Sequence, residues 1–121
     1  MKRYEETNKL FRFYEIRELI YVTFWLFNLD AYNMGYLREF ERVHEIIDEV
    51  LDFVKNASDK ELHSKYEKLA NYSDSKGEIY QIEGKFKDAL VWYEISLKYG
   101  DFPINEKTKK KILACKEKEG N

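Results

Sequence analysis

The chain has 121 residues and a formal net charge of −2, and 44% of its residues are hydrophobic, 17% aromatic and 36% charged. This composition excludes a disordered chain and indicates one folded domain, residues 1–121, with a heavily solvated exterior. The near balance of charge removes the strongest general argument for a nucleic-acid partner, because nucleic-acid binding usually leaves a clear basic excess.

The first expected helix, which Gly35 ends, is the most hydrophobic part of the chain. Residues 19–29 place apolar side chains on every face of such a helix, so it must be covered on more than one side. The run is too short to cross a bilayer, which takes about 20 residues, and no membrane span is expected. The helix is either the centre of the core or a surface for a partner protein or a second copy of the chain, formed by Tyr21, Phe24 and Trp25. A buried β-strand over residues 20–24 is a third possibility.

A second helix is expected over residues 36–55. Its apolar residues recur at intervals of three and four and predict a buried stripe: Phe40, Val43, Ile47, Val50 and Leu51. A stripe of the same spacing begins 46 residues after Phe40, at Phe86. The repetition indicates either two related helical hairpins or simply two amphipathic helices.

Polar residues of this second helix allow two chemical interpretations. Glu41 and His44 form the E-x-x-H pattern of di-iron bundles, but such sites need a second pair and two further glutamates. Arg38 and His44 resemble the Arg/His pair of helical HEPN ribonucleases, although Glu39 stands where that family prefers other polar residues. A small RNA-binding protein or ribonuclease is therefore the alternative function. The simpler interpretation places these side chains on the solvent edge of the helix, and we expect no metal, no cofactor and no catalytic residue.

A third helix is expected to begin near Asp59, because Ser58 and Glu61 form a capping box that would satisfy amides at a helix start. It can run unbroken to Glu83, although residues 71–75 are poor helix formers. Small and aromatic residues on one face would leave a narrow seam for another backbone: Ser73, Gly77, Tyr80 and Gly84.

A turn at Gly84 leads to a fourth helix with a continuous apolar stripe: Phe86, Ala89, Leu90, Tyr93, Ser96 and Leu97. Gly100 offers the left-handed conformation that often closes a helix, and Pro103 bars its continuation. The segment therefore predicts an antiparallel helical hairpin.

Residues 71–103 resemble a single tetratricopeptide repeat (TPR), a helix-turn-helix unit of about 34 residues. The matching positions are Gly77, Tyr80, Gly84, Phe86, Ala89, Tyr93 and Leu97, with Ser96 in place of the usual alanine. Ser73, Lys76 and Asp101 depart from the pattern, which commonly has tryptophan, leucine and proline there.

The resemblance implies an all-α fold of antiparallel helical hairpins, about five helices in one small right-handed stack or bundle. Hairpin 1 would cover about residues 5–55, hairpin 2 about 59–100, and a closing helix about 104–119. It also implies a non-enzymatic scaffold or adaptor that binds another protein through a groove or through the aromatic first helix.

In tetratricopeptide proteins the ligand usually lies against the first helix of each hairpin. Here the face of that helix opposite the seam would present a polar and mildly acidic surface: Asn71, Asp74, Glu78 and Gln81. A ligand that ends in a carboxylate fits such a surface poorly. The expected partner is therefore a neutral or basic protein or peptide.

The last expected helix, about residues 104–119, would cover the end of the stack. Residues 105–119 carry six lysines against three glutamates, and such a face is either simply solvated or touches an acidic partner or RNA. The segment lacks the arginines and interleaved aromatic residues that RNA-binding segments commonly use. Cys115, the single cysteine, is expected to be a small apolar residue of this helix. One cysteine cannot form an internal disulfide, which favours a cytoplasmic location.

Overall fold

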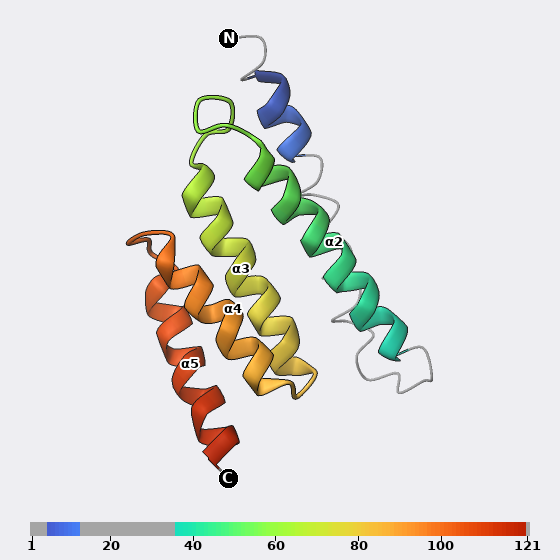
Figure 1. Ribbon diagram of the computed structural model, residues 1–121, viewed down its shortest axis with the longest axis vertical. Coiled ribbons are helices and arrows are strands. Elements are labelled where there is room, and N and C mark those ends of the chain that lie inside the picture. The colour runs from blue at the N-terminus through green and yellow to red at the C-terminus, as the bar shows by residue number, and fades with distance from the viewer. Residues whose placement is uncertain (1–4, 13–35, 121) are drawn as a thin grey trace. The chain divides into compact units, whose positions relative to one another are not determined.

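The computed structural model describes residues 5–12 and 36–120 (Figure 1). All regular secondary structure in these residues is helical, and they contain no strand, which confirms the all-α class. Residues 5–12 form a short helix. The longer helices of the described part are α2 (Tyr36–Asn56), α3 (Lys65–Ile82), α4 (Phe86–Lys98) and α5 (Asn105–Gly120). No helix in this part is both long enough and apolar enough to cross a membrane.

The aromatic run of residues 19–29 lies outside the described residues. The proposed partner surface of Tyr21, Phe24 and Trp25 and the strand considered for residues 20–24 therefore stay predictions.

The chain divides into two compact units, Met1–His63 and Ser64–Asn121. In the first unit, α2 confirms the helix expected over residues 36–55. The expected stripe on α2 is buried throughout: Phe40, Val43, Ile47, Val50 and Leu51. Exposed acidic residues such as Glu41 and Asp48 occupy the opposite side, as an amphipathic helix requires.

One carboxamide organises the end of the first unit. The Nδ2 group of Asn8 donates a hydrogen bond to the carbonyl oxygen of Glu61 (2.9 Å), and the backbone N–H of His63 donates one to Asn8 Oδ1 (3.2 Å). The amide side chain therefore pairs with two backbone groups of a non-helical segment that would otherwise need solvent.

The expected helix start near Asp59 is wrong, because α3 begins at Lys65. The capping hydrogen bond does form: the N–H of Glu61 lies 3.1 Å from the Ser58 hydroxyl oxygen. It closes only a single turn, and Ser64 then adopts a left-handed conformation with φ 54°, which a right-handed helix cannot contain. The capping box identified a local turn correctly but could not show how far the helix would propagate.

Once started, α3 runs without interruption through residues 71–75 to Ile82. Gly84 ends the turn with φ 83°, a value that costs glycine little and other residues more. The N–H of Lys85 donates to the Tyr80 carbonyl (2.9 Å) and that of Gly84 to the Gln81 carbonyl (3.0 Å), so these two carbonyl groups near the end of the helix are satisfied.

The predicted hairpin of α3 and α4 is confirmed, and its two helices approach closely at Gly77. A Cβ atom at Gly77 would lie 2.7 Å from Cδ1 of Tyr93 and 3.2 Å from the carbonyl oxygen of Ala89. Only glycine leaves room for the Tyr93 ring there. The Ser96 hydroxyl donates to the Ala70 carbonyl at 2.7 Å and links α4 to α3 nearer the start of α3.

The lysine that replaces a leucine of the repeat pattern is also buried. Lys76 is only 5% exposed, and its ammonium lies 5.1 Å from the Trp92 ring centroid and 5.7 Å from that of Tyr80. Its aliphatic chain can cover apolar surface while the charge is held over aromatic rings. A lysine is thereby accommodated at a position typical of an apolar residue.

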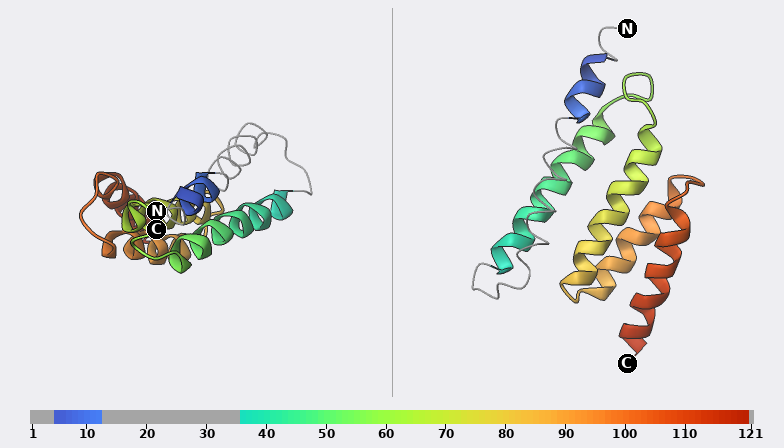
Figure 2. Two further views of the ribbon diagram at one scale, coloured as in Figure 1. Left: turned by 90° about the horizontal axis from the view of Figure 1, so that it is seen from above. Right: turned by 180° about the vertical axis from the view of Figure 1, so that it is seen from behind.

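In the second unit, α4 packs along both α3 and α5 (Figures 1 and 2). Its core centres on Ala89, Tyr93 and Cys115, against which Phe86 and Ile112 also pack. Cys115 is fully buried, as expected for a small apolar residue of the closing helix. Cys115 and Ile112 hold α5 against this core. The adjacent polar face of α5 therefore lies beside α3.

Candidate functional site

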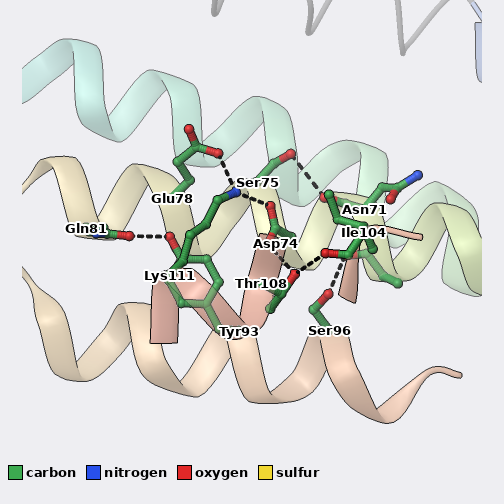
Figure 3. Close-up of polar contacts among 11 residues, drawn as sticks. Asn71, Asp74, Ser75, Glu78, Gln81, Tyr93, Ser96, Ile104, Thr108 and Lys111 are labelled. Carbon is green, nitrogen blue, oxygen red and sulfur yellow. Dashed lines mark hydrogen bonds and ion pairs between the residues drawn. The ribbon is translucent and has the colours of Figure 1, made fainter. Parts of the chain in front are cut away.

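A buried polar bridge joins α5 to α3 (Figure 3). The Thr108 hydroxyl donates to Asp74 Oδ1 at 2.6 Å, and the Lys111 ammonium donates to Asp74 Oδ2 at 2.7 Å. Asp74 is only 3% exposed and Thr108 fully buried. Both carboxylate oxygens thus have a donor, which burial of a charged group requires. We call Asp74, Thr108 and Lys111 the bridge.

The expected position of Asp74 on an open acidic surface is wrong. The carboxylate is covered by α5, which places Thr108 and Lys111 over it. These two residues are three positions apart and so share one face of α5. That spacing was the available signal, but the sequence does not show that this face would be turned toward α3.

Lys111 makes a second link to α3. Its ammonium lies 3.0 Å from Glu78 Oε2, and the side chains of Lys111 and Glu78 are 25% and 53% exposed. Burial alone would lower the pKa of Lys111, but the hydrogen bonds and charges of Asp74 and Glu78 outweigh it and raise that pKa above its ordinary value. Lys111 therefore keeps its positive charge throughout the physiological pH range.

Tyr93 connects the bridge to the hairpin. Its hydroxyl donates to Gln81 Oε1 at 2.6 Å, and its ring centroid lies 5.8 Å from the Lys111 ammonium (Figure 3). Burial, and then the negative charge of Asp74, raise the pKa of Tyr93 above its ordinary value of 10.0. Tyr93 and Lys111 both stay protonated near neutral pH, so these two groups hold fixed positions and charges rather than exchange protons.

Two hollows flank the bridge along α3 and α5. Hollow A has a volume of about 280 Å³ and is lined by Glu67, Asn71, Pro103, Ile104 and Lys107. Hollow B has a volume of about 390 Å³ and is lined by Glu78, Gln81, Ile82 and Lys111. In each hollow α3 supplies a carboxylate and a carboxamide, while a lysine comes from α5. We call the two hollows, with the bridge between them, the α3–α5 groove.

The four residues expected on the groove face of the third helix all lie at this groove, in different ways. Asn71 lines hollow A, Glu78 and Gln81 line hollow B, and Asp74 is held in the bridge. The sequence interpretation missed the contribution of α5, namely Lys107 and Lys111. Both lysines are part of the lysine-rich run noted in the sequence, but its helical phase toward α3 depends on tertiary packing.

The described residues give no structural support to the ribonuclease, metal-site or reactive-cysteine interpretations. His44 is half-buried on α2, and the side chain of Arg38 lies outside what the structure describes, so the ribonuclease hypothesis stays a prediction. No group of three or more His, Cys, Asp or Glu side chains in residues 5–12 and 36–120 could hold a metal ion. Burial, followed by the charge of Glu119, raises the pKa of Cys115, so its thiol stays protonated near neutral pH.

Comparisons with known proteins add no information about this groove. No family model, no curated protein and no solved structure matches the chain.

Proposed function

We propose that this protein is a non-enzymatic interaction module that binds a peptide segment of a partner protein in the α3–α5 groove. The observation that carries the proposal is the pair of hollows on either side of the bridge, each lined by charged, carboxamide and apolar side chains. Such groups can pair with peptide N–H and C=O groups and with side chains of an extended segment.

The resemblance to a tetratricopeptide repeat supports the same conclusion. The Asp74–Thr108 hydrogen bond joins residues 34 positions apart, and this separation is about the length of one such repeat. In addition, α5 runs parallel to α3 (Figure 1), since higher-numbered residues of α3 pair with higher-numbered residues of α5. Helix α5 thus stands where the first helix of a following hairpin would stand, and the proposed ligand lies against the first helices of successive hairpins.

The charge of the groove indicates a neutral or basic partner segment. Its carboxylates are Glu67, Asp74 and Glu78, against the two lysines Lys107 and Lys111. A strongly acidic ligand would meet unfavourable charge on the α3 side. We place the protein in the cytoplasm, because its single, buried cysteine is typical of a reducing compartment.

Selection from a random peptide library displayed on phage tests this function with the full chain. Selected peptides are then measured by fluorescence polarisation against the wild type, Asn71→Lys and Glu78→Lys, and against Glu94→Lys on the exposed side of α4 as a control. Circular dichroism checks that each variant is folded. We expect affinity to fall on the order of tenfold in each groove variant and to be unchanged in Glu94→Lys. No selected peptide, or peptides that bind all four proteins equally, would remove the groove from consideration.

A further inference from the structure

The α3–α5 groove is electrically polarised across its width. Every carboxylate that lines the hollows or the bridge comes from α3, and every ammonium comes from α5. Each hollow has one carboxylate and one ammonium group. These are Glu67 and Lys107 in hollow A, and Glu78 and Lys111 in hollow B. A ligand in this groove therefore has an acidic wall on one side and a basic wall on the other.

Ion pairs link the acidic and basic walls at the bridge and hollow B, but not at hollow A. Lys111 contacts both Asp74 and Glu78 directly. In contrast, Glu67 and Lys107 line the same hollow but form no ion pair with each other or with any other residue that the structure describes. Hollow A thus presents two opposite charges that are not paired with each other, which suits a ligand lying between them.

The length of the groove sets the length of the ligand. Glu67 and Glu78 are separated by three turns of α3, or about 16 Å at the helical rise of ~1.5 Å per residue. An extended chain covers that distance in about five residues. The carboxamides of Asn71 and Gln81 lie within the same interval and can bond the peptide groups of such a segment.

We propose that the groove binds an extended segment in which basic and acidic residues alternate. In an extended chain, successive side chains point to opposite sides. Alternation therefore presents the basic residues to the α3 wall and the acidic residues to the α5 wall. A uniformly basic segment would set half of its charges against Lys107 and Lys111. A segment with charges in blocks would match only one of the two walls at each hollow. This inference rests on the proposed function and narrows its partner to a segment of nearly zero net charge.

Two synthetic peptides of the same composition provide the test. One is acetyl-Ser-Arg-Glu-Arg-Glu-Arg-Glu-Ser-amide, and the other carries the same residues in blocks, acetyl-Ser-Arg-Arg-Arg-Glu-Glu-Glu-Ser-amide. Binding to the full chain is measured by isothermal titration calorimetry at low salt. We expect the alternating peptide to bind at least about fivefold more tightly, because it presents the favourable sign to both walls at each hollow.

A charge swap tests the wall polarity directly. The double variant Glu67→Lys/Lys107→Glu keeps the net charge but reverses hollow A relative to hollow B, so it should abolish the preference for the alternating peptide. The control swap Lys87→Glu/Glu94→Lys on exposed positions of α4 should preserve it. Equal binding of the two peptides to the wild type, binding of neither, or an unchanged preference in the Glu67/Lys107 swap would each overturn the inference. Phage-selected peptides that still depend on Asn71 and Glu78 would show that the proposed function survives such a failure.

Discussion

The two faces of α3 that carry its contacts in the second unit are built on different physical principles. Toward α4, contact is steric: Gly77 leaves space that the Tyr93 ring fills, and a buried hydroxyl closes the seam. Toward α5, contact is electrostatic: Asp74 is enclosed by donors from Thr108 and Lys111. The comparison teaches that residue size along one helix can indicate a close approach, whereas a buried charge reveals its partner only when both helices are placed.

The largest expected effect breaks the steric face. Gly77→Val should lower the free energy of unfolding by about 2–3 kcal/mol, because its side chain would overlap the Tyr93 ring and overpacking of a core costs about 1–3 kcal/mol. Urea unfolding followed by circular dichroism measures the change. Ser75→Val on the same helix controls for the helix propensity of valine. If both variants unfolded at the same urea concentration, the close contact at Gly77 would not contribute to stability.

The electrostatic face is tested by a double-mutant cycle. Lys111→Met leaves the Asp74 carboxylate buried without its cation and should cost about 1–3 kcal/mol, since unpaired buried charge is strongly destabilising. Adding Asp74→Leu should recover most of that loss, because the charge that needed a partner is then gone. Urea unfolding of the four proteins gives the coupling free energy.

The exposed pair of Arg42 and Glu45 on α2 supplies the matched control for that cycle. Its atoms lie 3.3 Å apart, but its side chains are 57% and 62% exposed. Arg42→Met and Glu45→Leu should show almost no coupling, as solvated ion pairs do. A coupling as large as that of Asp74 and Lys111 would show that burial is not what makes the bridge important.

A smaller effect distinguishes the buried hydroxyl of the steric face from ordinary helix propensity. Ser96→Ala restores the residue usual in tetratricopeptide repeats but removes the hydrogen bond to the Ala70 carbonyl, at a cost of about 1 kcal/mol. Ser75→Ala removes a hydroxyl that bonds within α3 and should be neutral or slightly stabilising. Differential scanning calorimetry of both variants would show a lower Tm for Ser96→Ala only; equal Tm values would contradict this assignment.

The smallest effect is expected at alkaline pH. It involves Tyr93 from the steric face and Lys111 from the electrostatic face. The pKa values of both groups are raised in the folded state, so each binds its proton more tightly when folded. Their contributions to stability are complete below the ordinary values of 10.0 and 10.5 and decline as pH rises above them. Urea midpoints between pH 8 and 11 should therefore fall from about pH 10 upward. Tyr93→Phe should flatten this decline, and an identical decline would assign it to other groups.

Local signals in the sequence were sufficient for much of the fold. The spacing of Phe40, Val43 and Ile47 predicted α2, and Gly84 predicted the turn between α3 and α4. The capping box at Ser58 misled, because one hydrogen bond cannot decide whether a helix continues beyond a turn.

The candidate site was predictable only on its α3 side. Asn71, Asp74, Glu78 and Gln81 share a face, and the structure places all four at the groove. The opposite wall could not be inferred, because α5 carries lysines on several sides, and which of them turn toward α3 depends on how Cys115 and Ile112 pack into the core.

The parallel arrangement of α3 and α5 has a consequence for protein engineering. Because the bridge joins positions 34 residues apart, it fixes the register of α5 relative to α3. A designed helix grafted after α5 and packed antiparallel to it, like α4 against α3, would complete a second hairpin without altering the bridge. A further helix carrying threonine and lysine at the spacing of Thr108 and Lys111 would extend the groove by one module, provided that the residue of α5 beneath it is changed to aspartate. The bridge can thus be repeated to attach further helices to this chain.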